Sequence, residues 1–329
     1  MPFGKFHKRM GLGLSCCLAL LLVAFINVGS SSEYPTKPVQ LMVPFGPGGG
    51  SDIIARLVSD KMSTLLGQTV LVVNKTGGGG TLGTYTALAA PPDGYTVIVI
   101  SPTMLYAPLV TKGITYGLKD FDPINLSVTS PYLAVVRKEA PWQTLEELIA
   151  ESKKNPGKLT YSTPGYGGTD HFVGELFNMK MGTNITHVPM DGAGPAIDAV
   201  LGGHISLAFA NYGVAHKYLE AGSLRPLMVF AGSRLKDFPG APTVVEKGSS
   251  DLVFSTWQGF ALRTGTPKGY AAKLGNVMKE VFKEKDIVGN LEKVGWMVEN
   301  LDAKRATELL DKDYRTRLEV ARVANIIPK

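Results

Sequence analysis

Residues 39–66 read VQLMVPFGPGGGSDIIARLVSDKMSTLL, and this stretch decides the fold class. Its first five residues are apolar except for Gln40, and they predict a short buried strand. After a glycine-rich turn, apolar residues recur every three or four positions over 51–66, as on one face of an amphipathic helix. Gly67 stands where glycine commonly ends a helix. The stretch therefore predicts a strand, a glycine loop and a helix.

The same alternation continues along the chain. We expect strands at 70–74 and 96–101 with a helix at 81–90 between them, and this β-α-β-α-β order predicts a parallel sheet with right-handed crossovers. A second α/β set follows, with helices at 145–153, 169–181, 195–201 and 214–221 and strands at 159–163, 186–188, 206–211 and 224–230. A loop-rich stretch then runs to Gly265, and two long helical patterns occupy 267–282 and 303–325.

Two α/β sets predict an α/β protein of two doubly wound lobes joined by a hinge. We expect the chain to cross between the lobes near Val135 and to return near Trp257. The predicted first lobe comprises 33–134 plus 257–329, and the predicted second lobe comprises 135–256.

The N-terminus has the order of a secretory signal peptide. Basic residues between Lys5 and Arg9 precede an apolar run over 11–28, and small residues follow at 29–32. We therefore predict a signal peptide at 1–32, cleaved between Val28 and Glu33, and a periplasmic location. The alternative is a retained membrane anchor, because an 18-residue apolar run approaches the length that spans a bilayer.

Composition excludes several classes of function. Lys5, Lys8 and Arg9 are the only Lys or Arg residues before Lys37, so the chain without 1–30 carries 31 basic and 28 acidic side chains. That balance is too even for nucleic-acid binding. Both cysteines lie inside the predicted signal peptide, so the exported chain has no disulfide and no thiol chemistry. Export also argues against ATP or NAD as the ligand, because those pools are cytoplasmic.

Glycine-rich loops follow strands in both sets, where ligands of open α/β sheets bind. The loop over 44–52 has three successive glycines at the start of a helix, so backbone N–H groups at the positive helix end suit an anion. The alternative is that Ser51 or Asp52 simply caps the helix. The loops over 164–171 and 189–195 open helices of the second set in the same way. Two lobes with glycine-rich helix starts are what a clamshell anion receptor needs.

The remaining motifs favour structural roles. Gly78, Gly80 and Gly83 match G-x-G-x-x-G, but no acidic residue stands near 101–103, so we interpret them as close helix–sheet packing and not as a dinucleotide site. His171 and His187 have no Cys or second His at metal-ligand spacing, so we expect structural hydrogen bonds from them. The chain carries no G-x-S-x-G, H-E-x-x-H or P-loop motif.

Ten stretches, taken in order, resemble the tripartite tricarboxylate transporter receptors, also called Bug or TctC-like receptors. They cover essentially the whole predicted mature chain, and their ordered set is far more specific than any one of them. The stretches are 34–39, 43–52, 74–83, 90–95, 119–121, 156–159, 174–177, 187–189, 201–203 and 265–267.

The resemblance implies a type II periplasmic-binding-protein fold and no enzymatic activity. It implies a monomer that holds a small organic carboxylate with loop backbone and water, without cofactor or metal. It also implies delivery to a membrane transporter with one large and one small subunit. The ligand-binding residues expected from it are Phe45, Gly48, Gly49, Gly50, Ser51, Asp52, Ser101, Thr103, Tyr166, Gly167, Gly168, Thr169, Asp170, His171 and Asp191.

Some residues depart from the family pattern and bear on the ligand. The departures are Gly46 for Pro, Tyr166 for Asn, Gly168 for a hydroxyl residue, Met190 for Tyr and Asp191 for Lys. Asp191 and Asp170 together would repel a distal carboxylate, so we expect a neutral, aromatic or cationic distal group. Tyr166 and Met190 are candidates to pack against it. The alternative is that Asp191 faces solvent or caps the helix that begins near Pro195.

Two other functions remain open at the level of sequence. An enzyme on the same fold would need paired catalytic groups, and the loops offer only isolated Asp52, Asp170 and His171. A sensory receptor would present its ligand-bound form to a signalling partner. The sequence does not separate transport from sensing.

Overall fold

The computed structural model describes residues 34–190, 192–323 and 326. The described residues from Lys37 onward belong to one compact unit. The predicted signal peptide at 1–32 lies outside the described residues. Within the described part of the chain, no helix is both long and apolar enough to cross a membrane.

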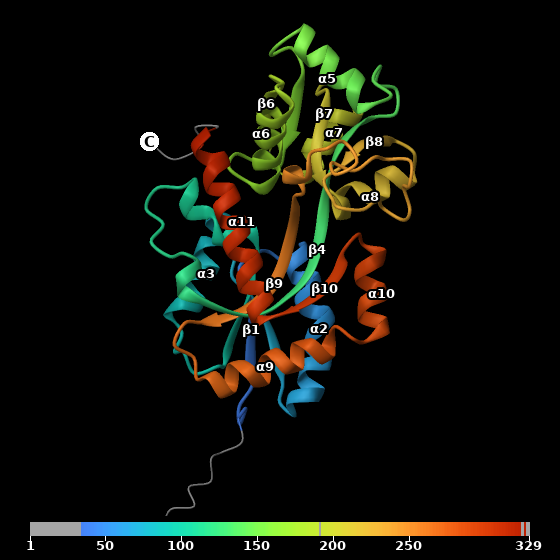
Figure 1. The fold of residues 1–329 in the computed structure, drawn as a ribbon. Coiled ribbons are helices and arrows are strands. Elements are labelled where there is room, and N and C mark those ends of the chain that lie inside the picture. The colour runs from blue at the N-terminus through green and yellow to red at the C-terminus, as the bar shows by residue number, and fades with distance from the viewer. Residues whose placement is uncertain (1–33, 191, 324–325, 327–329) are drawn as a thin grey trace, which may run out of the picture. The chain divides into compact units, whose positions relative to one another are not determined.

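Strands and helices alternate through most of the described chain (Figure 1). The strands are β1 (Val39–Val43), β2 (Val70–Asn74), β3 (Thr96–Ile100), β4 (Phe121–Arg137), β5 (Thr160–Thr163), β6 (Thr186–Pro189), β7 (Leu207–Asn211), β8 (Leu224–Val229), β9 (Ser255–Arg263) and β10 (Met297–Asp302). The helices are α2 (Gly50–Leu66), α3 (Thr81–Ala89), α4 (Pro102–Leu105), α5 (Leu145–Lys154), α6 (Thr169–Met181), α7 (Ala193–Leu201), α8 (Tyr212–Glu220), α9 (Lys268–Val281), α10 (Lys285–Lys293) and α11 (Ala303–Val323).

The strands join in the order β2-β1-β3-β9-β4-β7-β5-β6, and β8 and β10 also pair with β4. β1 is parallel to β2 and β3, and β5 is parallel to β6 and β7, as predicted for the two α/β sets. The strands β9, β10, β7 and β8 run antiparallel to β4, so the sheet as a whole is mixed. The antiparallel pairs arise because two long strands return through the middle of the sheet.

The long strand β4 links two groups of elements (Figure 1). Its first part, 121–131, pairs with β9, whereas 132–137 pairs with β7 and β8. We call β1–β3, β9 and β10 with α2–α4, α9 and α10 the first lobe, and β5–β8 with α5–α8 the second lobe. The predicted two-lobed α/β architecture is confirmed. Val135 lies in β4 and Trp257 in β9, while the lobe boundaries themselves stay a prediction.

The strands β4 and β9 are findings that the sequence did not predict. Pro123 and Pro131 lie inside β4, where proline is normally an argument against a strand. Pro123 is tolerated because the register between β4 and β9 shifts beside it, and Pro131 ends the pairing with β9. The short elements α10 and β10 were also missed. The predicted helix at 303–325 is observed up to Val323, and 324–325 lie outside the described residues.

Buried side chains form hydrophobic clusters in both lobes, and one of those in the first lobe surrounds Trp257. The first-lobe cluster contains Trp257 with residues of β3 and α4, and one second-lobe cluster contains Phe172 and Phe209. The helix α11 contributes to both of these clusters, because Leu310 belongs to the first and Val320 to the second. The last helix thus packs on both lobes.

Candidate functional site

The first glycine loop joins β1 to α2 and is held by a buried carboxylate. Asp52 is 3% exposed, and its carboxylate accepts hydrogen bonds from Gly48 N (2.9 Å), Asn74 Nδ2 (2.9 Å) and Arg56 Nε (3.0 Å). The bond from Arg56 is the main cause that lowers the pKa of Asp52 to about 2, against the opposing effect of burial. Asp52 is therefore ionised, and both of its carboxylate oxygens accept hydrogen bonds from within the protein. It shapes the loop and leaves the outer N–H groups exposed.

Ser51 connects the same loop to the sheet. Its hydroxyl donates to Gln258 Oε1 at 2.7 Å, and both side chains are buried. Gln258 lies on β9, and a Cβ built on Gly50 would lie 3.6 Å from its Nε2 and 3.3 Å from the ring of Trp296. Sequence reasoning missed Gln258 and Trp296 because neither follows a predicted strand. A glycine at position 50 lets this amide and this ring approach the loop.

The end of β3 supplies a buried hydroxyl. Ser101 is 6% exposed, and its Oγ has no hydrogen-bond partner among the described residues. Thr103 follows in the first turn of α4 and is exposed. An unpartnered buried hydroxyl is costly, so Ser101 is a candidate to bind a ligand atom.

The glycines of 76–83 pack against their neighbours. A Cβ at Gly83 would lie 2.6 Å from both Lys75 O and Pro44 Cα. The interpretation of these glycines as close packing is confirmed at this position, because any side chain there would strike the backbone. The loop thus serves the shape of the first lobe.

The second glycine loop joins β5 to α6 and contacts the first lobe. Gly168 is the N-cap of α6 and has an extended backbone (φ −75°, ψ 172°). Gly167 has φ +72°, which favours glycine, and a Cβ there would lie 3.0 Å from the side chain of Val110. Val110 follows the segment that carries Ser101 and Thr103. The structure thus brings the second-lobe loop next to one of the predicted first-lobe segments.

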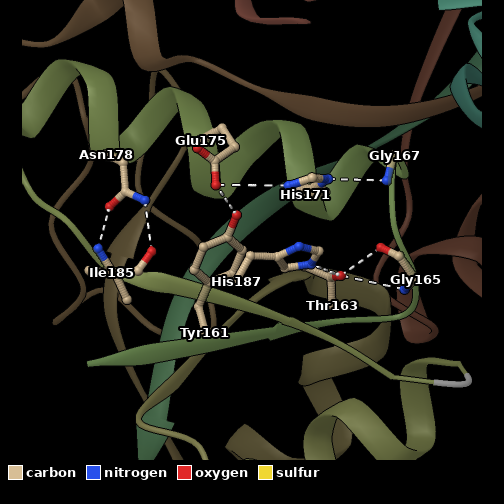
Figure 2. Close-up of polar contacts among 9 residues, drawn as sticks. All are labelled: Tyr161, Thr163, Gly165, Gly167, His171, Glu175, Asn178, Ile185 and His187. Carbon is tan, nitrogen blue, oxygen red and sulfur yellow. Dashed lines mark hydrogen bonds and ion pairs between the residues drawn. The ribbon is translucent and has the colours of Figure 1, made fainter. Parts of the chain in front are cut away.

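Two stacked imidazoles support the second loop (Figure 2). The rings of His171 and His187 lie 3.8 Å apart at 15°. His171 Nδ1 accepts from Gly167 N at 3.1 Å, so its proton is on Nε2. Thr163 Oγ1 donates to Gly165 O at 2.7 Å, so the 2.7 Å contact with His187 Nε2 has the imidazole as donor. His171 holds loop backbone and His187 holds the hydroxyl of Thr163, so both make the structural hydrogen bonds that the sequence predicted, but their stacking was not foreseen.

The imidazole pair is uncharged. Burial, with a further contribution from His187, lowers the pKa of His171 to about 3, and burial lowers the pKa of His187 to about 4. Tyr166 leans over His171 with 4.7 Å between the ring centres, and 64% of its side chain is exposed. The second loop therefore presents the exposed ring of Tyr166 over a neutral imidazole. The described residues contain no cluster of three or more His, Cys, Asp or Glu arranged to hold a metal ion.

Of the two acidic residues predicted for the site in the second lobe, Asp170 is among the described residues and Asp191 is not. Asp170 is partly buried in the first turn of α6, and Tyr132 Oη donates to its Oδ2 at 3.2 Å. Burial raises the pKa of Asp170 to about 6. Asp191 lies outside the described residues, so its role in ligand charge stays a prediction. Met190 is partly buried and packs against the second-lobe core.

One cation approaches the second loop from a distant part of the chain. Arg317 of α11 is 1% exposed, and its Nη1 lies 3.4 Å from Thr169 Oγ1. Sequence reasoning found no Lys or Arg in the loops and missed Arg317, because it comes 148 positions later on a helix read only for its periodicity.

A groove of about 950 Å³ lies away from these loops, lined by parts of β4, α9, β10 and α11. One polar side chain of its wall is satisfied within the protein, since Asn125 Nδ2 donates to Asn300 Oδ1 at 2.9 Å and to Leu301 O at 3.1 Å. The glycine loops instead offer two helix N-termini and the unpartnered hydroxyl of Ser101. We therefore place the candidate site at the loops and not in the groove.

Comparison with known proteins identifies the family. Residues 54–326 match the model of the tripartite tricarboxylate transporter family receptor. The protein BugT of Bordetella pertussis is 31% identical over 265 residues, which cover 79% of this chain and 80% of BugT.

Two solved structures agree in fold. The periplasmic binding protein BugD has a TM-score of 0.75 and 27% identity, covering 90% of this chain and all of that chain (100%). MatC from Rhodopseudomonas palustris with bound malate has a TM-score of 0.74 and 28% identity, covering 87% and 99%. These likenesses confirm the predicted periplasmic-binding-protein fold. The chain belongs to the tripartite tricarboxylate transporter receptor family, the Bug or TctC-like receptors.

Proposed function

We propose that the protein is a periplasmic receptor that binds a small organic carboxylate between the first turns of α2 and α6. It delivers this acid to a tripartite membrane transporter with one large and one small subunit, and it performs no chemistry on it. The ligand-contacting set is the one expected from the family resemblance, with Ser101 as its first-lobe hydroxyl and the loops at 45–52 and 166–171 as its backbone donors.

The observation that carries the proposal is a pair of glycine N-caps. Gly49 is the N-cap of α2 and Gly168 is the N-cap of α6, and neither helix has a side-chain capping bond at its N-cap. Uncapped N–H groups at a positive helix end suit a carboxylate. A Cβ at Gly168 would meet nothing within 4 Å, so this backbone faces open space.

The occupied side chains support binding without catalysis. Asp52 is committed to Gly48, Asn74 and Arg56, and His171 is committed to Gly167. Neither is placed as a free base beside a nucleophile, which general acid–base chemistry requires. The malate bound to MatC supports a carboxylate as the ligand class.

A thermal-shift screen tests the proposal. Malate, succinate, butyrate and benzoate are compared with malamide, butyramide and benzamide at equal concentration. An acid at 100 times its Kd stabilises the protein by about 2.7 kcal/mol, which raises the Tm by several degrees, and the matched amide does not. Stabilisation by the amides but not by the acids contradicts a carboxylate site.

The identity of the membrane protein that binds the receptor distinguishes delivery to a transporter from sensing. Genes for one large and one small membrane subunit beside this gene favour transport, and a histidine-kinase gene favours the sensory alternative. Co-purification of the acid-loaded receptor with those membrane subunits supports delivery. Co-purification with a kinase ectodomain instead would assign the sensory role.

Export is tested on the mature protein. We propose cleavage of the signal peptide between Val28 and Glu33, which releases a monomer into the periplasm. Mass spectrometry of the periplasmic fraction should find a chain that begins after Val28. An intact Met1 in the membrane fraction would establish a retained anchor.

A further inference from the structure

The C-terminal helix α11 connects the two lobes beside the candidate site (Figure 1). Ala306 and Leu310 in its first half belong to the first-lobe core. Val320 and Ala321 in its last turns belong to the second-lobe core, and α11 also contacts α6. Arg317 lies between these two halves and is almost completely buried.

The guanidinium of Arg317 is held in a cage of aromatic rings from both lobes. Its Cζ lies 4.9 Å from the ring centre of Tyr106 in the first lobe and 5.7 Å from that of Phe172 in the second. The ring of Phe254, just before β9, lies 4.6 Å away. Such cation–π contacts stabilise a desolvated guanidinium. They also fix its position, because the rings come from separate segments.

The hydrogen bonds of Arg317 divide between its own helix and α6. Nε donates to Asp313 Oδ1 at 3.0 Å, and the other oxygen of Asp313 accepts from Trp257 Nε1 at 2.7 Å. Nη1 reaches Thr169 Oγ1 at 3.4 Å. Nη2 is buried and has no hydrogen-bond partner among the described residues. Burying a guanidinium with an unmatched donor is costly, so its position at this point requires a reason beyond packing.

Thr169 supplies that reason. It is the first residue of α6 after the N-cap Gly168, and it is 5% exposed. Arg317 therefore contacts the helix turn whose N–H groups face the carboxylate in the proposed function. The predicted ligand loops contain no Lys or Arg, and a helix end alone supplies only about half a positive charge.

We propose that Arg317 is a positioning residue of the carboxylate site, which fixes the first turn of α6 against α11 and adds positive charge behind it. This inference rests on the proposed function for its ligand, but the effect on α6 does not. Arg317 acts through Thr169 and does not itself contact the carboxylate.

Arg225 provides a matched control. It is an arginine of β8 with a buried Nε that also lacks a partner, and its other nitrogens bond Gln143 Oε1 and the carbonyl oxygens of Ala140 and Trp142. All of these groups lie in the segment between β4 and α5, apart from the glycine loops. R225Q thus removes a comparable charge without touching α6.

The experiment compares wild type, R317Q, R317K and R225Q. The first readout is hydrogen exchange of the ligand-free proteins, by mass spectrometry of a peptide over 164–176 with α5 as internal reference. The second is the Kd for whichever of malate, succinate, butyrate and benzoate stabilises the wild type most. R317Q should speed exchange at 164–176 and weaken binding, each about tenfold, and R317K should recover part of both. R225Q should change neither, even where it lowers the Tm.

Two results overturn the proposal. One is an R317Q protein whose exchange over 164–176 equals that of wild type. The other is a loss of affinity in R225Q as large as that in R317Q, which would make both effects general loss of stability. If none of the four acids binds wild type, the proposed ligand class fails while the exchange readout still decides the role of Arg317. If R317Q does not fold, T169V removes the same contact from the other side and should speed exchange equally.

Discussion

The two glycine loops place a helix N-terminus in similar ways but are braced by opposite chemistry. The first loop is held by Asp52, an ionised carboxylate that pairs with Arg56. The pKa of Asp52 is lowered to about 2. The second loop is held by His171, a neutral imidazole that stacks on His187. The pKa of His171 is lowered to about 3. One brace depends on a charge and the other on its absence.

This difference shows that two chemically unlike side chains can hold a glycine loop at the start of a helix. The carboxylate of Asp52 accepts a hydrogen bond from the first loop, and Nδ1 of His171 accepts one from Gly167 in the second loop. What each loop offers outward is backbone. The side chains set the direction of the N–H groups. A carboxylate bound there would accept hydrogen bonds from these N–H groups and from the hydroxyl of Ser101.

The largest expected effect is loss of binding when a side chain covers this backbone. G49V and G168V should each weaken binding of the best acid at least about 100-fold, because Val blocks the approach to the N–H groups. Both positions have ordinary φ values near −75°, so a side chain there adds no backbone strain and the fold should persist. Calorimetry measures the Kd and circular dichroism the fold.

Gly269 supplies the control for these variants. It is exposed, has nothing within 4 Å of a built Cβ, and lies in the first turn of α9 away from the glycine loops. G269V should bind with wild-type affinity. If G49V and G168V also bind normally, the anion site is elsewhere.

The second prediction compares the acids of the two loops. D52N should lower the free energy of unfolding at pH 7.5 by about 1–3 kcal/mol, because Gly48, Asn74 and Arg56 lose a charged acceptor. D170N should leave it unchanged or raise it, because burial disfavours the ionised form of Asp170 in the folded state. Urea unfolding measures both. Equal losses would show that the two acids play the same part.

The third prediction concerns pH. The folded-state pKa values of His171 and His187 lie below 6.5, so the unfolded chain takes up their protons first, and stability falls as pH drops from about 6.5 toward 4. H171Q should therefore lose roughly 1–2 kcal/mol less than wild type between pH 7 and pH 5. H204Q, which removes an exposed imidazole, should follow the wild type. An H171Q slope identical to wild type would mean that His171 titrates alike in both states.

The sequence was sufficient for the parts of the fold that follow local rules. The strand β1 and the helix α6 lie where periodicity predicts them, and Gly67 ends α2 with φ 66°. It was insufficient for β4, because Pro131 and a run of mixed polarity hide a strand that is buried on both faces. Such a strand is recognised only from its neighbours, and those are distant in the sequence, as with Ala208 opposite Val135 and Arg263 opposite Phe121.

The candidate site divides in the same way. The glycine loops were predictable, because a strand followed by glycines and a helix places backbone donors at a sheet end. The parts that support them were not. His187 reaches His171 from a neighbouring strand, Gln258 reaches Ser51 from β9, and Arg317 reaches Thr169 from the last helix. Tertiary contacts over such separations leave no periodic pattern in the sequence.

The smallest expected effect concerns Asp191, which lies within the loop over 189–195. If this carboxylate lies near the site, it repels a distal ligand carboxylate by about 1–2 kcal/mol after solvent screening. D191K should then shift the affinity ratio between succinate and butyrate about tenfold toward succinate. An unchanged ratio would show that Asp191 does not select ligand charge.

A crystal structure with the tightest-binding acid of the screen tests the central claim most directly. The account predicts one carboxylate within hydrogen-bond distance of N–H groups in the first turns of both α2 and α6, with Ser101 Oγ as a further partner. An acid bound in the groove between α9 and α11, or held by only one of the two helix ends, would contradict it.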